Sequence, residues 1–338
     1  MRALVLNSPG HLTLQDWPEA TFPSEGEVLV QVHRVGICGT DIHAYGGKQP
    51  FFSYPRVLGH ELGVEVLALG PNVSNVRVGD KCAVEPYLNC QTCIACRRGK
   101  GNCCANLRVL GVHAEGGMRE RFTLPARKLH VRNSLSFDQL ALVETLGIGA
   151  HAVARAQVET DEWILVIGAG PIGLGVMQFA REAGAHVIAL DTNEQRLRFC
   201  RDHWGIEHAI LADENALNRV RDLTNGDLPT AVFDATGHPT SMNRAFDFVA
   251  PSGRLTFVGL HQGEVVFRDA DFHRKELSLL ATRNALPQDF ERILSSIERG
   301  TINTTPWITH RAQIEEVPTT FSTWTNPQSG VLKALIEI

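Results

Sequence analysis

The sequence has no long apolar run and no strong excess of one charge. No stretch of its 338 residues reaches the roughly 20 apolar residues that a membrane-spanning helix needs. The first residues carry one arginine and a short apolar run before proline, glycine and polar residues, which is not the pattern of a signal peptide. A net charge of −5 gives no basic surface for a polyanion. We therefore expect a cytoplasmic protein with no membrane and no nucleic-acid partner.

Internal repeats, low-complexity tracts and long charge runs are also absent. The composition, with 43% hydrophobic and 20% charged residues, is that of a folded globular protein. The length exceeds what one hydrophobic core usually supports, so we expect two domains. In a reducing cytoplasm, closely spaced cysteines are more often metal ligands or catalysts than disulfides.

The two halves of the chain have different patterns. Early segments are short Val-, Ile- and Leu-rich runs punctuated by glycine, proline and asparagine, which predicts strands at 27–36, 62–70 and 80–86. From Trp163 the chain alternates buried strands with helices, which predicts a parallel α/β sheet. Within 163–191 we predict a strand, a glycine turn, a helix with Gly184 near its end, and a strand ending at Asp191.

The later part of the chain continues this alternation and then loses it. We predict strands at 230–237 and 253–260 with a helix over 240–250 between them. Beyond Thr282 we predict an amphipathic helix over 287–300, followed by irregular chain. These changes of pattern place the domain boundaries near residues 150 and 281.

Six of the eight cysteines lie between Cys82 and Cys104, and four of them form the pattern C-x2-C-x2-C-x7-C. Four thiolates so closely spaced can surround one tetrahedral Zn²⁺, and a site with four protein ligands is structural rather than catalytic. An iron–sulfur cluster is the competing interpretation. Cys103 is an alternative fourth ligand, and Cys82 and Cys200 are expected in the core. The four proposed ligands are Cys90, Cys93, Cys96 and Cys104.

A second set of metal-ligating residue types lies outside this cluster. Cys38, in "GICGTDIHAYGG", supplies a sulfur, while His60 and Glu61, in "VLGHELGVEV", supply a nitrogen and a carboxylate. Glu144 could supply another oxygen. Three protein ligands plus water is the pattern of a catalytic zinc, whose open position receives a substrate oxygen.

Gly168, Gly170 and Gly173 form G-x-G-x-x-G between a predicted strand and a predicted helix. Glycine permits the tight turn and lets backbone N–H groups approach a pyrophosphate. Asp191 ends the next strand, where its carboxylate can accept hydrogen bonds from ribose hydroxyls and would repel a 2′-phosphate. We therefore predict NAD as cofactor, although Arg196, five residues further on, could soften that preference.

Together these motifs resemble the zinc-containing medium-chain alcohol dehydrogenase family, in the branch of sorbitol, L-threonine and sugar-acid dehydrogenases. The likeness rests on "GICGTDIH", "GHE", the four-cysteine lobe, "GAGPIG" and the strand-end Asp191. It implies an α/β protein with a GroES-like β-rich catalytic domain (1–150), a Rossmann doubly wound parallel sheet domain that binds NAD (151–281), and a C-terminal return to the catalytic domain (282–338). The active site would lie in the cleft.

The resemblance also assigns roles to single residues. Cys38, His60 and Glu61 match the catalytic-zinc positions, Glu144 matches a direct or intermittent ligand, and Cys104 rather than Cys103 matches the structural site. The chain would thus hold two Zn²⁺ ions, and the turn residues Gly168, Gly170, Pro171, Ile172 and Gly173 would contact NAD. Thr40 and His43 match a relay that carries the substrate proton away. A homotetramer or homodimer is implied.

The expected reaction is oxidation of a secondary alcohol to a ketone on a small hydroxylated substrate. Arg283, in "ATRNALPQDF", resembles a substrate-pocket arginine and could hold a carboxylate or several hydroxyls. The resemblance around Arg283 is to dehydrogenases that act on hexonates such as galactonate, gulonate or idonate. A polyol dehydrogenase or a threonine dehydrogenase is the rival interpretation. Alternatively, Arg283 does not bind substrate and only pairs with a neighbouring carboxylate or contacts the cofactor. An inactive nucleotide-binding sensor would not require Cys38, Thr40, His43, His60 and Glu61 together.

Overall fold

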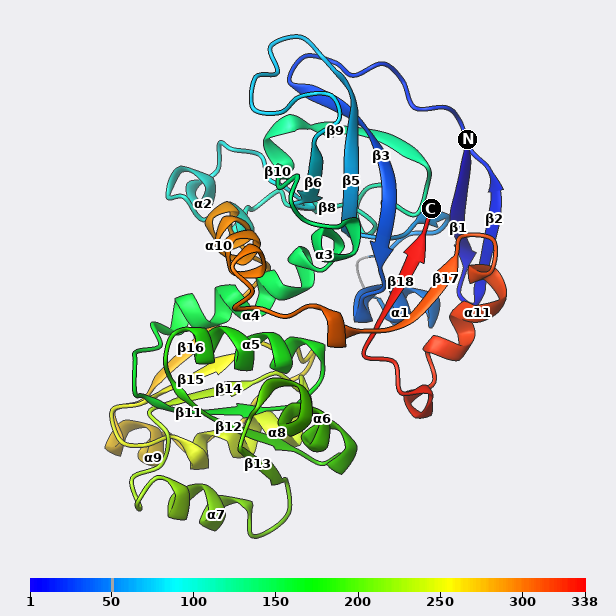
Figure 1. The fold of residues 1–338 in the computed structure, drawn as a ribbon. Coiled ribbons are helices and arrows are strands. Elements are labelled where there is room, and N and C mark those ends of the chain that lie inside the picture. The colour runs from blue at the N-terminus through cyan, green and yellow to red at the C-terminus, as the bar shows by residue number, and fades with distance from the viewer. Residues whose placement is uncertain (50–51) are drawn as a thin grey trace. The chain divides into compact units, whose positions relative to one another are not determined.

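The computed structural model describes residues 1–49 and 52–338 (Figure 1). The chain divides into two compact units, the first formed by residues 1–145 and 286–338 and the second by residues 146–285. The breaks therefore fall five residues before and four residues after the predicted boundaries at 150 and 281. In the described parts of the chain, no helix has the length and apolarity needed to cross a membrane.

The first unit is built on a mostly antiparallel sheet with the strand order β10-β6-β5-β3-β18-β17, in which β9 also pairs with β3. Central strand β3 alternates buried and half-buried residues along most of its length, as expected for a strand with one face on the core. A smaller sheet, β2-β1-β4, lies in the same unit. The strands of the main sheet are β3 (Glu27–Gly36), β5 (Glu61–Leu69), β6 (Lys81–Val84), β9 (Arg121–Pro125), β10 (Leu129–Val131), β17 (Ile308–Gln313) and β18 (Lys333–Glu337), and those of the smaller one are β1 (Arg2–Ser8), β2 (His11–Asp16) and β4 (Arg56–Val57).

The predicted irregular chain after residue 300 is wrong. Helix α10 (Pro287–Glu298) is followed by strand β17, helix α11 (Val317–Trp324) and strand β18. Strand β18 pairs antiparallel with β3, with Leu335 opposite Gly36. Because this pairing joins residues about 300 positions apart in sequence, no local pattern announces it. Strand β17 is also half exposed along its length, so its apolar signal is weak.

The second unit contains a six-stranded sheet in which every neighbouring pair is parallel. Its order is β13-β12-β11-β14-β15-β16. Counted along the chain this is 3-2-1-4-5-6, the order of the doubly wound nucleotide-binding fold, in which ligands bind beyond the carboxyl ends of β11 and β14. The Rossmann-type sheet predicted from the sequence is confirmed. The strands are β11 (Trp163–Ile167), β12 (His186–Asp191), β13 (His208–Leu211), β14 (Ala231–Asp234), β15 (Arg254–Phe257) and β16 (Ser278–Ala281).

The helices of the second unit follow the predicted alternation with one difference. Helix α5 (Pro171–Glu182) begins directly after the glycine turn, with proline at its first position. The helix predicted over 240–250 is shorter: α8 (Pro239–Arg244) passes into a 3₁₀ turn over Ala245–Phe248. The tighter turn accompanies the burial of Phe246 and Phe248 in the core beside the sheet. The remaining helices are α6 (Glu194–Trp204), α7 (Ala216–Leu223) and α9 (Asp269–Arg274), preceded by α4 (Val143–Ala156), which crosses the break between the units.

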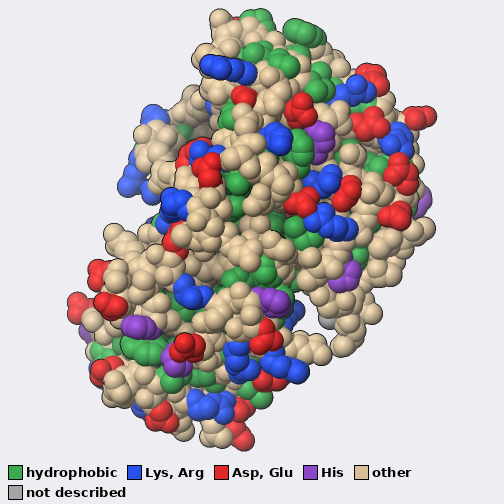
Figure 2. Space-filling model, in the orientation of Figure 1, with side chains coloured by type: hydrophobic (Ala, Val, Ile, Leu, Met, Phe, Trp, Pro, Cys, Tyr) green, Lys and Arg blue, Asp and Glu red, His purple; other side chains and the backbone are tan. Residues whose placement is uncertain are grey.

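The surface carries charges of both signs. On the face shown in Figure 2, Lys and Arg side chains are interspersed with Asp and Glu. No broad region of that face carries one sign alone.

Candidate functional site

The structure brings Cys38, His60 and Glu61 together in the first unit. Cys38 follows β3 and precedes helix α1 (Gly39–Tyr45), while His60 and Glu61 lie at the start of β5. Strands β3 and β5 are neighbours, with Gly36 opposite Glu61, so pairing of these strands delivers all three side chains. Their candidate ligand atoms all lie within 4.8 Å of one another.

Gly36 makes room for this arrangement. A Cβ atom on Gly36 would lie 2.1 Å from Oε2 of Glu61. Any side chain at position 36 would therefore displace the Glu61 carboxylate, which is fully buried.

Asp41 lies next to the candidate ligands and contacts the backbone beside them. This buried carboxylate accepts hydrogen bonds from the backbone N–H of Cys38 (2.9 Å) and of Gly59 (3.3 Å). It also lies 3.8 Å from Nδ1 of His60. This distance is too long for a hydrogen bond, but a carboxylate behind a ligating histidine is a common feature of metal sites. The sequence analysis did not single out Asp41, although its place in the Gly-Thr-Asp run beside Cys38 was a usable signal.

The electrostatics of His60 fit a cation site. Burial lowers the pKa of His60, but the negative charges of Asp41 and Cys38 outweigh it and raise the pKa well above 6.5. Its Nδ1 atom is buried and has no hydrogen-bond partner among the described residues. An anionic environment that stabilises a proton on a buried imidazole would also stabilise a metal cation there.

Lys333, in the last strand, completes this cluster, and the sequence analysis missed it. Its ammonium donates to both carboxylate oxygens of Glu61, at 2.6 and 2.8 Å, and to the backbone oxygen of Ile37 at 3.0 Å. Lys333 is 2% exposed and Glu61 is fully buried. Burial lowers the pKa of Lys333, but the charges of Glu61 and Cys38 outweigh it and raise the pKa above its ordinary value, so the side chain is charged.

Glu144 lies near this cluster but outside the group of atoms within 4.8 Å. It sits in the first turn of α4, is 5% exposed, and accepts a short hydrogen bond from the Tyr87 hydroxyl. Burial raises the pKa of Glu144. The pKa of Tyr87 is raised by burial and by the charge of Glu144. Glu144 is therefore held by a neutral donor close to the three candidate ligands. Tyr87 was also missed, because a single aromatic residue in a strand most often serves packing.

The two proposed relay residues lie on α1, directly after Cys38. Thr40 is half-buried and His43, one turn later, is exposed. A helical turn thus leads from the half-buried Cys38 towards solvent.

The second cysteine group forms a compact set of four sulfur atoms within 4.8 Å of one another. The Sγ atoms of Cys93 and Cys104 are 3.9 Å apart. Tetrahedral coordination with Zn–S bonds of about 2.3 Å separates sulfur atoms by about 3.8 Å, so a single zinc ion fits. A multi-iron cluster, in which the cysteines bind different irons, would need wider spacing. Cys103 is exposed and is not in the set.

Backbone N–H groups point at these sulfurs, as expected for thiolates. The N–H of Cys90 and that of Asn106 each lie 3.3 Å from Sγ of Cys104, and that of Cys93 lies 3.4 Å from Sγ of Cys90. The Thr92 hydroxyl and the backbone N–H groups of Thr92 and Cys93 lower the pKa of Cys90 to about 5. Cys90 is thus favoured as a thiolate, whereas burial raises the pKa of Cys104 to about 11, so that thiol would lose its proton on binding a metal.

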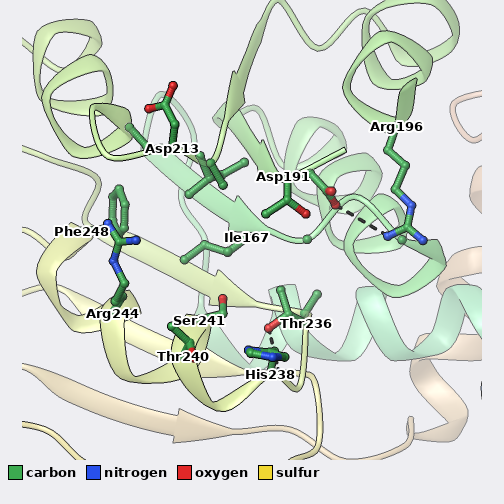
Figure 3. Close-up of a pocket in the computed structure, with 17 residues that line it drawn as sticks. Ile167, Asp191, Arg196, Asp213, Thr236, His238, Thr240, Ser241, Arg244 and Phe248 are labelled. Atoms are coloured by element: carbon green, nitrogen blue, oxygen red, sulfur yellow. Dashed lines mark hydrogen bonds and ion pairs between the residues drawn. The ribbon is translucent and has the colours of Figure 1, made fainter. Parts of the chain in front are cut away.

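A cavity of about 550 Å³ lies in the second unit, beyond the carboxyl ends of β11 and β14 (Figure 3). Gly168, Gly170, Asp191 and Arg196, four of the predicted cofactor residues, line it. Further lining residues include Thr236, His238, Ser241 and Arg244 from the region around α8. Pro171, Ile172 and Gly173 begin helix α5 beside it but do not line it.

Each of the three positions in the turn is glycine for a different structural reason. Gly168 has a φ of +99°, and a Cβ on Gly173 would lie 1.7 Å from the backbone oxygen of Gly168, so the protein itself requires both. A Cβ on Gly170 would meet only Nη1 of Arg196, at 3.9 Å. The space above Gly170 is therefore open at the helix start, as a pyrophosphate site requires.

Asp191 occupies the centre of the cavity wall (Figure 3). Its Oδ2 accepts the backbone N–H of Ala169 at 2.6 Å and its Oδ1 that of Asn193 at 2.8 Å. Nη1 of Arg196 lies 3.8 Å from Oδ2. The turn thus fixes the carboxylate, while the half-exposed Arg196 places a positive charge beside it.

Arg283 does not line this cavity. It is exposed and belongs to the second unit, three residues before the break at 285/286, whereas the sequence analysis assigned 282–338 to the return segment. Its substrate role stays a prediction.

Comparisons with known proteins identify the family of the chain. Residues 24–133 match the model of the alcohol dehydrogenase GroES-like domain, and residues 171–299 match that of the zinc-binding dehydrogenases. L-galactonate-5-dehydrogenase of Escherichia coli K12 is 40% identical over 315 residues, which cover 92% of this chain and 91% of that protein. Sorbitol dehydrogenase of Halalkalibacterium halodurans is 31% identical over 94% of each chain.

A solved structure shows the same fold over the whole chain. The alcohol dehydrogenase RspB of Escherichia coli CFT073, in complex with NADH, superposes with a TM-score of 0.93 at 31% identity, covering 100% of this chain and 99% of that one. Both domain models and full-length relatives thus match a chain that carries a four-cysteine lobe and a glycine turn. The chain belongs to the zinc-containing medium-chain alcohol dehydrogenase family, whose members are NAD(P)-dependent oxidoreductases that act on CH–OH groups.

Proposed function

We propose that the protein oxidises a secondary hydroxyl group of a six-carbon sugar acid, such as galactonate, gulonate or idonate, to a ketone with NAD. The supporting observation is the Cys38–His60–Glu61 cluster in a chain 40% identical to a protein named L-galactonate-5-dehydrogenase. A binding protein without turnover would not need this cluster in addition to the four-cysteine lobe.

Cys38, His60 and Glu61 would hold a catalytic zinc, and the four-cysteine lobe a structural one. Bound zinc supplies a Lewis acid that stabilises negative charge developing on the substrate oxygen by several kcal/mol. The Asp41 carboxylate lies 3.8 Å from Nδ1 of His60, and Glu144, held by Tyr87, would be a direct or intermittent further ligand.

Two residues of α1, Thr40 and His43, would carry the substrate proton away. The Thr40 hydroxyl can accept one proton while donating another. His43 can pass the proton on to water, because a neutral imidazole has one nitrogen that accepts a proton and one that donates. His43 is exposed and Thr40 is half-buried, which suits a path from a closed site to solvent.

The glycine turn and Asp191 would hold NAD. The open space above Gly170, at the start of α5, suits the pyrophosphate, and Gly168, Pro171, Ile172 and Gly173 shape that turn. Each Asp191 oxygen accepts one backbone N–H and keeps acceptor capacity for a ribose hydroxyl. The carboxylate disfavours the 2′-phosphate of NADP, and Arg196 reduces that penalty without removing it, because its charge lies 3.8 Å away on a half-exposed side chain.

The substrate assignment can be tested with a matched acid and alcohol. We expect zinc-dependent reduction of NAD with galactonate, and a much lower kcat/KM with galactitol, which lacks the carboxylate but keeps the hydroxyls. Arg283→Ala should raise KM for the acid and leave the alcohol unchanged. Preference for galactitol would establish a polyol dehydrogenase, and activity with threonine alone a threonine dehydrogenase. Either result would contradict the proposed substrate.

The oligomer belongs to the proposal as well. We expect a homodimer or homotetramer, and light scattering on the purified protein would measure its mass directly.

A further inference from the structure

Three buried carboxyl side chains and one thiol gather around the Cys38 cluster. Asp41 and Glu61 are fully buried and Glu144 is 5% exposed, and the Cys38 thiol lies beside them. Lys333 lies among these groups and its charge acts on Glu61, Cys38 and Glu144. A permanent cation is thus built into a region that would also bind a metal cation.

The contacts of Lys333 are complete and specific. An ammonium group has three N–H donors. Those of Lys333 face three acceptors, namely the two Glu61 oxygens at 2.6 and 2.8 Å and the Ile37 carbonyl at 3.0 Å. The side chain is 2% exposed, so it cannot turn to water without breaking the core.

Both oxygens of Glu61 therefore face the lysine, while one of them also lies within 4.8 Å of the Cys38 and His60 ligand atoms. A metal in the cluster competes with Lys333 for this carboxylate. The Glu61 carboxylate could serve both cations if one of its oxygens bound the metal and the other kept its hydrogen bond with the Lys333 ammonium. Ligation by both Glu61 oxygens would occupy the position that a substrate oxygen needs.

We propose that Lys333 is a positioning residue that restricts Glu61 to ligation through one oxygen and so keeps one metal coordination position open. The inference rests on the catalytic-metal assignment of the proposed function. If Lys333 is removed, Glu61 becomes a buried carboxylate without its counter-ion, and the metal is the cation that can replace it. Glu61 would then bind through both oxygens, hold the metal more tightly and close the open position.

The test uses Co²⁺-substituted full-length protein and azide as the probe. Subtracting the absorption spectrum of the Cys38→Ser variant isolates the site that contains Cys38 from the four-cysteine site. Azide titration then measures access to the open position, and extraction by a chelator measures how firmly the metal is held. Lys128→Met is the matched control, because Lys128 is 3% exposed and forms a comparable buried pair with Glu85.

In Lys333→Met we expect azide affinity to fall by at least about tenfold and metal extraction to slow, while Lys128→Met behaves as wild type in both. A lysine that serves only stability would make the metal easier to remove, so slower extraction separates the two roles. Lys333→Arg keeps the charge and should restore azide binding. Lys333→Gln, which removes the charge but keeps a hydrogen-bond donor, replaces Lys333→Met if that variant does not fold.

Unchanged azide affinity in Lys333→Met, or loss of azide binding in Lys333→Arg equal to that in Lys333→Met, would overturn the inference. Absence of any Cys38-dependent Co²⁺ spectrum in wild-type protein would instead overturn the catalytic-metal assignment and this inference with it. A failure of the hexonate assignment alone leaves both readouts unaffected, because neither uses substrate.

Discussion

In the glycine turn after β11, Gly170 is needed for the proposed cofactor site, whereas Gly173 is needed for the fold itself. Gly170 has φ −80° and ψ −179°, which alanine adopts freely, and an added Cβ would come no closer than 3.9 Å to another atom. Gly170→Ala should therefore change the free energy of unfolding by less than about 1 kcal/mol, since weaker helix capping and a less flexible unfolded chain oppose each other. The methyl group would enter the space proposed for the pyrophosphate, and we expect NAD affinity to fall at least about tenfold, or about 1.4 kcal/mol.

Gly173→Ala is the matched control, because it places the same methyl group one helical turn away. Its Cβ would lie 1.7 Å from the Gly168 oxygen, so α5 must move away from the turn. Overpacking of this kind costs about 1–3 kcal/mol and should lower the unfolding temperature by several degrees. Calorimetric titration with NAD and thermal unfolding would be measured on both variants. Wild-type NAD affinity in Gly170→Ala, or a loss of stability equal to that of Gly173→Ala, would refute the reasoning.

Three further predictions follow from the charges and thiols. Asp191→Asn should raise kcat/KM with NADP relative to NAD by about tenfold or more, because the repulsion of the 2′-phosphate is removed; an unchanged ratio in cofactor kinetics would contradict this. Cys104→Ser should lose one zinc per chain by elemental analysis, whereas Cys103→Ser should keep both; equal losses would place Cys103 in the site. Burial lowers the pKa of His130, but its hydrogen bond with Glu291 helps to raise it above 6.5, so this stabilisation is complete below pH 6.5 and is lost as pH rises through the raised pKa. His130→Gln should flatten the decline of the urea midpoint as pH rises above about 6.5, and an unchanged slope would show that another group controls it.

The fold of the second unit could be predicted from local sequence, and that of the C-terminus could not. Buried parallel strands read as short apolar runs, and the glycine turn marks where the strand before it ends, so β11, α5 and β12 were found. Strand β18 is five residues long and acquires its place by pairing with β3, far away in sequence. Long-range pairing of this kind leaves no periodic signal.

The candidate site shows the same division. Residue types that bind metals or phosphates draw attention by themselves, as Cys38, His60 and the glycines did. Lys333 and Tyr87 act through partners that only the fold supplies, a carboxylate on another strand and a carboxylate at a helix start. A lysine directly before the apolar residues 334–336 was nevertheless a usable sign, since lysine is almost never fully buried unless it is paired.

The central claim is zinc-dependent oxidation of a hexonate with NAD. The most direct measurement is the initial rate of NAD reduction with L-galactonate by wild-type protein, by the same protein after removal of metal, and after zinc is restored. We predict turnover that disappears with the metal and returns with zinc, and none in Cys38→Ser although that variant still binds NAD. Full turnover without metal, or equal turnover in Cys38→Ser, would contradict the account.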